Sequence, residues 1–281
     1  MEKYIDLHTH SVYSDGSMTP TELVRHAKDS GLSAISLTDH DCIDGVKEAV
    51  CEGERIGLEV VPGIEFSVQS KTETHILGYF IDINSDALKE VLPEILRVRR
   101  ERGVQTEQNL KKQGIDVSYD EALTLAPGGL VGRAHFARIM VQKGYTASVK
   151  EAFDMYLSSG KKGFSSHQYL TDREAVRVIK ESGGLSFVAH LHLIRLSDEE
   201  LFEYLKSLKD VGLDGIEGYY TEYDEVMQKK YFEMAKELNL AISGGTDFHA
   251  ESKPHIAIGK GLGNMSIPYS VLEGIKDLKQ F

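Results

Sequence analysis

Histidines and carboxylates, the side chains that bind divalent metals most readily, occur in short groups along this sequence. His8 and His10 lie in DLHTH, His40 lies in LTDHD, and Asp247 and His249 lie in GGTDFH. The chain has only two cysteines, which are too few for a closed thiolate zinc site. Imidazole and carboxylate ligands together suit zinc, manganese or iron and, where the site stays open, hydrolytic chemistry.

Six histidines and three carboxylates form the candidate metal-binding set: His8, His10, Asp15, His40, Glu65, His75, His190, Asp247 and His249. Each short motif is weak alone, because an isolated histidine is usually structural. Their coincidence is stronger, and the set exceeds what one ion needs. We therefore predict two or three divalent ions (Mn, Fe or Zn), with a carboxylate such as Glu65 bridging, in a positive pocket that attracts phosphate.

The elements that must position these side chains are strands alternating with helix-length segments, a pattern typical of βα units with parallel strands. Seven of the nine ligands lie at or after strand ends, and catalytic groups converge at the carboxyl ends of parallel barrel strands. Capping signals at Thr19, Thr171 and Ser197 predict helices. The candidate strands are Tyr4–Leu7, Ala34–Leu37, Val60–Ile64, His75–Ile81, Leu185–Ala189, Asp214–Glu217, Ala241–Ser243 and Ile256–Ile258.

Residues 85–170 interrupt this alternation, because they contain helical patterns and no convincing strand. We interpret them as a helical insertion that forms a substrate-specificity lid, within a barrel made of residues 1–84 and 171–281. A second small core without a binding role is the alternative. A basic run in the insertion favours a solvated helix face over contact with RNA. The expected helices are Asp86–Gln113, Tyr119–Leu125, Arg133–Gln142 and Ser148–Leu157, and the basic run is Arg97, Arg99, Arg100 and Arg102.

The composition is that of an ordinary globular protein. Of the 281 residues, 41% are hydrophobic and 27% charged, and the net charge is −12. Such a charge repels nucleic acids and phosphorylated metabolites at long range, so an anionic substrate needs a local positive site. No targeting peptide or membrane-spanning run is apparent, and the expected location is cytoplasmic.

Taken together, the motifs resemble those of the PHP (polymerase and histidinol phosphatase) family of metallophosphoesterases. DLHTHSVYSDGSMTP resembles its first motif and SLTDHD its second. GIEFS and HILGY resemble the middle ligands, VAH the third motif and GGTDFH the fourth. The resemblance implies an α/β fold, a distorted seven-stranded βα barrel with a trinuclear metal centre, in place of the eight strands counted from the pattern.

The resemblance also distributes the ligands over three metals. The first would be bound by His8, His10, Glu65 and Asp247, the second by Asp15, His40 and His249, and the third by Glu65, His75 and His190. The insertion and GLVGRAHFARIM resemble the bacterial branch that removes the 3′-phosphate of nucleoside 3′,5′-bisphosphates, some members of which trim RNA from the 5′ end.

In that branch, Arg133, His135 and Arg138 would hold a second phosphate. AHLHLIRL lacks the branch's usual proline after the histidine, and Arg195 would serve as the arginine that follows it. No role is assigned to the residues of SSGKKGFSSHQYL that depart from the branch's lysine-proline form, namely Lys161, Lys162 and His167.

The expected reaction is hydrolysis of a phosphomonoester by a metal-bound hydroxide. His192 and Asp41 are candidates for acid or base, and Glu217 for a residue that contacts substrate or supports a ligand. The expected substrate is a small phosphorylated molecule of the nucleotide class, with short RNA as a further candidate. The alternatives are histidinol-phosphate phosphatase, a cyclic-phosphate diesterase and, outside enzymes, a metal-binding module associated with a polymerase.

Overall fold

The computed structural model describes residues 2–70, 72–126, 128–165 and 169–279. His167 lies outside them. Eight strands form one sheet in the order β7-β6-β5-β4-β3-β2-β1-β8. Their bounds are β1 Tyr4–Thr9, β2 Ala34–Leu37, β3 Glu59–Ser67, β4 His75–Tyr79, β5 Leu185–Val188, β6 Gly215–Tyr220, β7 Ala241–Gly245 and β8 Ile267–Pro268.

The sheet curls into a nearly closed barrel, in which the end of β7 meets β1. Thr9 forms a parallel bridge with Phe248, and the His10 amide donates to the Phe248 carbonyl at 2.9 Å. Gly245 permits this approach, since a Cβ there would lie 2.3 Å from the His8 Cβ. The predicted α/β barrel is therefore confirmed.

Two strand predictions need correction. Strand β4 runs antiparallel to both β3 and β5, so the barrel is not entirely parallel. The predicted strand Ile256–Ile258 is wrong, because this segment is a turn closed by a bridge between Ala257 and Gly261. The eighth strand is instead the two-residue β8, which pairs antiparallel with β1. Its short length accounts for the difference from a seven-stranded barrel.

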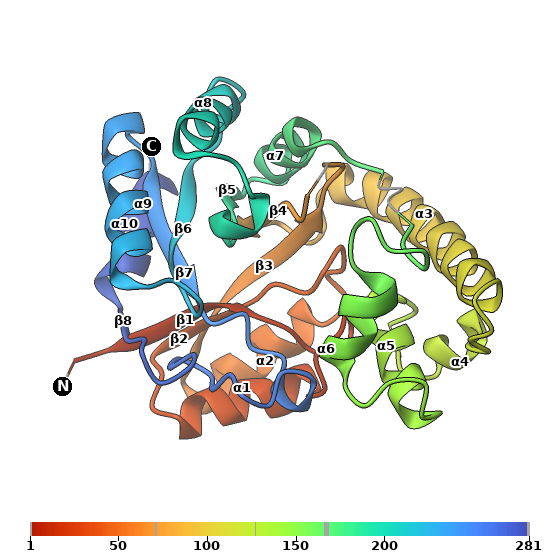
Figure 1. Cartoon of the computed structure of the whole chain (residues 1–281). Helices are drawn as coiled ribbons and strands as arrows, with labels where there is room; N and C mark the ends of the chain where they lie inside the picture. The colour runs from red at the N-terminus through yellow and green to blue at the C-terminus, as the bar shows by residue number, and fades with distance from the viewer. Residues whose placement is uncertain (1, 71, 127, 166–168, 280–281) are drawn as a thin grey trace.

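Helices surround the barrel (Figure 1). The predicted starts are confirmed at Thr19, Thr171 and Ser197, each of which closes a capping box that satisfies otherwise unpaired amides. The helices around the barrel are α1 Pro20–Asp29, α2 Val46–Ile56, α7 Asp172–Glu181, α8 Asp198–Lys209, α9 Glu225–Leu238 and α10 Ser270–Lys279. Two 3-10 turns, η2 Leu191–Ile194 and η3 Ala250–Ser252, accompany them.

The segment between β4 and α7 contains helices and no strand among its described residues, and it lies to one side of the barrel (Figure 1). Many of its buried apolar side chains, including Leu110, Phe136 and Met140, form a cluster of their own, whereas Leu88 and Ile95 near its start pack into the core of the barrel. The helices are α3 Asp86–Lys111, α4 Tyr119–Leu123, α5 Arg133–Gln142, α6 Val149–Ala152 and the π-helix η1 Phe153–Leu157.

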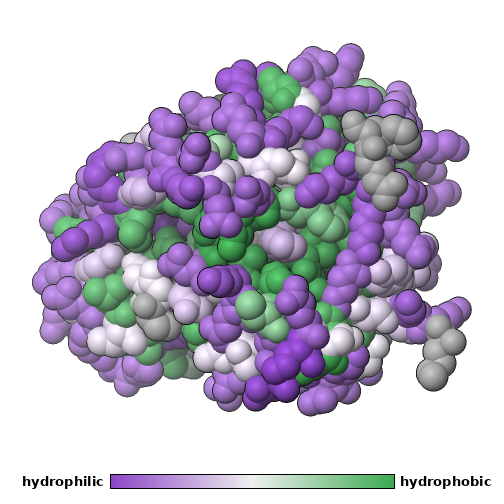
Figure 2. All heavy atoms as spheres, turned by 180° about the vertical axis from the view of Figure 1, so that it is seen from behind, coloured by the Kyte–Doolittle hydropathy of each residue, from purple (hydrophilic) through white to green (hydrophobic). Residues whose placement is uncertain are grey.

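The outer surface is mainly polar. Seen from behind, hydrophilic side chains cover most of the molecule, and apolar side chains show between them near the centre of this face (Figure 2). Within the described ranges, no helix is both long and apolar enough to cross a membrane.

Candidate metal centre

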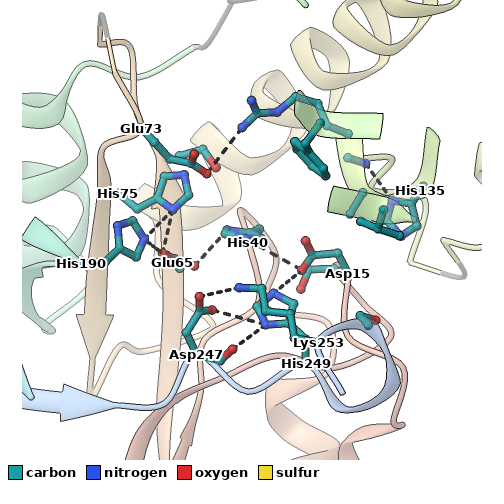
Figure 3. A pocket seen from close by; sticks show the side chains of 18 of the residues that line it. Asp15, His40, Glu65, Glu73, His75, His135, His190, Asp247, His249 and Lys253 are labelled. Carbon is teal, nitrogen blue, oxygen red and sulfur yellow. Dashed lines mark hydrogen bonds and ion pairs between the residues drawn. The ribbon is translucent and has the colours of Figure 1, made fainter. Parts of the chain in front are cut away.

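The nine candidate ligands gather at one rim of the barrel around the fully buried Glu65, and Figure 3 shows seven of them, all except His8 and His10. Its Oε2 lies 3.3 Å from the Nε2 atoms of His8 and His10 and 3.0 Å from His40 Nδ1. Its Oε1 lies 2.8 Å from His75 Nδ1 and 3.1 Å from His190 Nε2. The two carboxylate oxygens therefore face different sets of imidazoles, which is the arrangement a bridging carboxylate requires.

His75 reaches this rim because of the strand reversal. It is the first residue of β4, whereas the strand-end argument places ligands after strands. Because β4 is antiparallel to β3 and β5, its amino end lies beside the carboxyl ends of its neighbours. His75 pairs with Ser67 at the end of β3.

Asp15 and His249 form a second side of the cluster, on loops after β1 and β7. His249 Nε2 lies 3.0 Å from Asp15 Oδ1, and His40 Nε2 lies 3.9 Å from the same oxygen. The tight turn that carries Asp15 depends on Gly16, since a Cβ there would lie 2.4 Å from the His10 carbonyl oxygen.

Several buried ligand atoms have no hydrogen-bond partner among the described residues. They are His8 Nε2, His10 Nε2, Asp15 Oδ1, His40 Nδ1, Glu65 Oε2 and His190 Nδ1. Burial of unpaired polar atoms is costly unless a further group satisfies them. Donor atoms close enough to share an ion form three overlapping groups: His10, Asp15, His40 and His249; His8, His10 and Glu65; and His40, Glu65 and His75. This donor set fits divalent cations.

Hydrogen bonds on the outer side turn three imidazoles towards the cluster. His8 Nδ1 lies 2.8 Å from Glu217, and His249 Nδ1 lies 2.7 Å from the Asp247 carbonyl. His10 Nδ1 lies 3.3 Å from the Ser14 hydroxyl. If each Nδ1 carries the proton, each Nε2 presents a lone pair to the cluster.

Glu217 is fully buried and supports two ligands at once. Besides contacting His8, its carboxylate accepts the backbone amide of His190 at 2.7 Å. The sequence placed Glu217 at a strand end but indicated no partner for it. The structure identifies His8 and the His190 amide as its partners.

Sequence reasoning missed Lys253 and Tyr220, which hold Asp247. Lys253 Nζ lies 2.6 Å from Asp247 Oδ2, and the Tyr220 hydroxyl donates to the same oxygen at 3.0 Å. Asp247 Oδ1 remains directed at His10 Nε2, 3.2 Å away. Lys253 follows its partner by only six residues, and no motif distinguishes it from an ordinary surface lysine.

The ligands do not share one protonation state. Burial alone would lower the pKa of His10, but hydrogen bonds to Asp247 and Glu65 raise it to about 9. Nearby carboxylates also raise the pKa values of His8 and His190, so metal binding to these imidazoles would release protons.

Burial alone would raise the pKa values of Asp15 and Asp247, but His249 beside Asp15 and Lys253 beside Asp247 hold both well below the usual range. Burial and the Lys253 charge lower the pKa of His249 to about 4. The carboxylates are therefore ionised and His249 is neutral, which are the forms that coordinate metals.

Backbone strain is concentrated at this rim. Asp41, His190 and Asp247 have φ angles of 51°, 28° and 57°, a region that non-glycine residues seldom adopt. Such conformations persist only where the surrounding contacts hold them. Here Asp41 accepts from the Ser67 amide at 2.9 Å, and the His190 amide is held by Glu217.

The two acid or base candidates have different surroundings. Asp41 Oδ2 is 2.6 Å from the Arg99 guanidinium, and both side chains are buried. His192 Nε2 is 2.8 Å from Glu222 at the edge of the pocket. Its ring packs 5.5 Å from Tyr220.

The insertion supplies the wall opposite the metal ligands. His135 is fully buried in the pocket lining, and its Nδ1 accepts from the Gly132 amide at 2.9 Å. Arg133 lies 3.6 Å from Glu73 and stacks on Phe153 and Phe164; Figure 3 shows the Glu73 side chain pointing towards this wall.

Arg138 and Arg195 lie apart from this part of the wall. Arg138 lines the pocket, but its guanidinium already donates to the Asp15 carbonyl and the Ser252 hydroxyl. Arg195 is exposed and lines an adjoining hollow. The two hollows enclose about 290 and 490 Å³ and share Arg133 in their lining.

The interpretation of the basic run as a solvated face is wrong for half of it. Arg97 and Arg100 are exposed, but Arg99 is buried and Arg102 is half-buried in the pocket lining. The reason is helical spacing, because residues three apart share a face, and here that face covers the pocket.

Comparison with known proteins agrees with this geometry. The PHP domain family model matches residues 6–252. A 5′-3′ exoribonuclease of Haemophilus influenzae is 34% identical over 250 residues, covering 89% of this chain and 91% of the relative. A 3′,5′-nucleoside bisphosphate phosphatase of Chromobacterium violaceum is 34% identical over 248 residues, covering 88% and 87%.

Two solved structures share the fold along nearly the whole chain. One is a Chromobacterium violaceum amidohydrolase with bound sulfate and no metal (TM-score 0.84, 33% identity, 88% of each chain). The other is a metal-dependent phosphoesterase from Bifidobacterium adolescentis (TM-score 0.86, 25% identity, 97% of this chain and 95% of the other). The chain therefore belongs to the PHP domain family of metal-dependent phosphoesterases.

Proposed function

We propose that this protein removes the 3′-phosphate of nucleoside 3′,5′-bisphosphates. The observation that carries the proposal is a pocket with two unlike walls. One wall presents seven of the nine metal-type ligands, with His8 and His10 buried beside Glu65, and the other holds Arg133 and His135 from the insertion. A substrate with two phosphates fits such a pocket, because one phosphate can meet the metals while the other meets cationic and N–H donors.

The nine rim residues would hold two or three divalent ions, with Glu65 bridging. Such ions lower the pKa of bound water and neutralise charge on phosphoryl oxygens. Within the chain, Glu217 fixes the orientation of His8, and Lys253 fixes that of Asp247. These contacts preorganise the ligands, as hydrolysis at a fixed centre requires.

The opposite wall would recognise the nucleotide. With Nδ1 of His135 accepting from Gly132, Nε2 carries the proton, and this buried atom has no partner among the described residues. It is therefore available to donate to a phosphate oxygen. Phe153 and Phe164 provide aromatic faces beside Arg133, which suit a nucleotide base.

Proton donation to the leaving oxygen would fall to the His192–Glu222 pair, because Glu222 lines the pocket. Asp41 would act by positioning, since its carboxylate is already bound by Arg99 and the Ser67 amide. Arg138 would likewise brace the Asp15 loop, to which it is bonded.

A second candidate activity is removal of nucleotides from the 5′ end of short RNA. It is favoured by the larger hollow that continues from the pocket past Arg133, where further nucleotides could lie. The exoribonuclease relative has that activity in its name.

The proposal is tested by comparing adenosine 3′,5′-bisphosphate, histidinol phosphate, a cyclic phosphodiester and a short 5′-phosphorylated RNA at matched metal content. We expect the highest kcat/KM on adenosine 3′,5′-bisphosphate. A higher value on histidinol phosphate or on the cyclic diester would overturn the proposed specificity. Faster cleavage of RNA would make the second candidate the main activity.

A further inference from the structure

Lys253 places a positive charge on the barrel side of the pocket. It directly follows the 3-10 turn η3, on the segment after β7. Among the described barrel residues that line the pocket, it is the only lysine or arginine. Figure 3 shows its side chain reaching Asp247 among the metal-type ligands. Its charge therefore lies on the metal side of the pocket, opposite the arginines of the insertion.

The protein uses only part of the hydrogen-bonding capacity of this ammonium group. An ammonium carries three N–H donors, and within the described ranges that of Lys253 has one acceptor, Asp247 Oδ2 at 2.6 Å. The side chain is 35% exposed and lines the pocket. Donors of Lys253 are therefore left for a ligand that enters the pocket.

Lys253 lies beside ligands of two different expected ions. Asp247 directs Oδ1 at His10 Nε2, 3.2 Å away, and gives its other oxygen to Lys253. Burial and the Lys253 charge together lower the pKa of His249, so the ammonium is close to that ring as well. A phosphoryl group that reacts at this cluster would therefore be next to the ammonium.

We propose that Lys253 is a catalytic residue whose ammonium donates to the non-bridging oxygens of the phosphoryl group that is cleaved. The proposal deepens the proposed function, and it rests on it only in that a phosphate ester reacts at the rim. An ammonium and divalent ions repel each other, and the anionic phosphoryl oxygens would offset that repulsion. Donors that are already in place stabilise the charge on these oxygens in the transition state.

The first test compares Lys253→Met with the wild-type enzyme at saturating metal, on adenosine 3′,5′-bisphosphate and on p-nitrophenyl phosphate. The second substrate has one phosphate and a leaving group that needs no proton. We expect kcat/KM to fall about 10- to 100-fold on both substrates, as for loss of a charge-assisted hydrogen bond. Lys253→Arg should recover part of the loss, because it keeps the charge.

Two results of this comparison would overturn the proposal. One is unchanged kcat/KM on both substrates. The other is a loss confined to the bisphosphate, which would assign Lys253 to the second phosphate or to proton donation. Failure of the proposed function has a different signature, namely a wild-type enzyme that hydrolyses p-nitrophenyl phosphate but does not prefer the bisphosphate to adenosine 3′-monophosphate.

A measurement without turnover separates contact with phosphate from support of Asp247. It is the affinity of the metal-loaded protein for inorganic phosphate, measured by calorimetry with the bound metal quantified. We expect Lys253→Met to weaken this binding about tenfold or more while it still fills with metal at saturation. Lys260→Met is the matched control and should bind phosphate as the wild type does, because Lys260 is exposed in the same segment between η3 and β8.

Tyr220→Phe removes the other hydrogen bond to Asp247 Oδ2 and keeps the ammonium. We expect it to weaken phosphate binding less than Lys253→Met does. Equal losses in the two variants would overturn the proposal, since support of Asp247 would then explain both. Unchanged phosphate affinity in metal-saturated Lys253→Met would overturn it too and leave Lys253 a positioning residue.

Discussion

The barrel rim and the inserted helices form opposite walls of one pocket, and they differ in how their side chains are held. On the rim, several ligands have an outer partner that fixes their orientation, as His8 has Glu217 and Asp247 has Lys253. On the insertion, Arg102 has no counter-ion among the residues that the structure describes, and Arg133 meets Glu73 only at 3.6 Å. The side chains of the rim are held in place by protein contacts alone, whereas the insertion presents positive charge that the substrate would neutralise.

One buried contact joins the two regions. Arg99, from α3 of the insertion, is bonded to Asp41, which directly follows the ligand His40. This ion pair therefore couples the position of the insertion to that of the metal centre, in addition to the hydrogen bonds from Arg138 to the Asp15 loop and to Ser252.

The largest expected effect is on the rim. We predict that His190→Ala lowers kcat by about 10³-fold or more at saturating metal, because His190 borders Glu65 and His75 at the centre of the cluster. The matched control is His255→Ala, since His255 is exposed and outside the cluster. Phosphate release and bound metal are measured together, with circular dichroism to check folding. Near-normal turnover in metal-saturated His190→Ala would refute the assignment.

A smaller loss is expected from the rim's outer support. Glu217→Gln keeps the size of the side chain but removes the charge that orients His8 and holds the His190 amide. We expect metal affinity or kcat to fall about 10- to 100-fold. Metal titration of the apo-protein measures the first quantity, and unaltered affinity together with unaltered kcat would remove Glu217 from the site.

The link between the two walls is tested by Asp41→Asn. Loss of one partner leaves the buried Arg99 without a counter-ion, so we expect the protein to lose about 3 kcal/mol of stability. Urea unfolding measures the change. Arg97→Met, which removes an exposed ion pair, should change stability by less than about 1 kcal/mol. Equal effects of the two substitutions would show that the Arg99–Asp41 contact does not join the regions.

The smallest effect concerns His135 on the insertion wall. Burial lowers the pKa of His135 to about 4, so below about pH 6.5 the unfolded chain binds a proton that the folded chain does not. The stability contributed by neutral His135 is complete above that pH and is lost as the pH falls towards 4. Between pH 7 and 5, wild type should lose about 1 to 2 kcal/mol more stability than His135→Gln. Parallel pH profiles of the two proteins would contradict this.

The same two regions differ in what the sequence could predict. On the rim, His8, His40 and Asp247 could be placed because each follows an apolar run, and carboxyl ends of parallel strands converge. His75 could not be placed by that rule, since it begins a strand, and only the reversed direction of β4 brings it to the rim.

On the insertion, helical periodicity predicted α5 with the bounds that the structure shows. The face of α3 that meets the barrel was not predictable, because helix propensity does not distinguish the faces of a helix. Arg99 and Arg102 therefore looked like surface residues in the sequence, although both turn inward. The predicted division into barrel and specificity lid stays an interpretation, and the Asp41 variant tests the contact that joins its two parts.

The central claim is that metals on the rim act on the 3′-phosphate while the insertion binds the 5′-phosphate. Incubation of the metal-loaded protein with adenosine 3′,5′-bisphosphate, followed by identification of the nucleoside product, tests it most directly. We predict release of inorganic phosphate and adenosine 5′-monophosphate, abolished by a chelator and restored by a divalent metal. Formation of adenosine 3′-monophosphate, or no phosphate release by the metal-loaded protein, would contradict the claim.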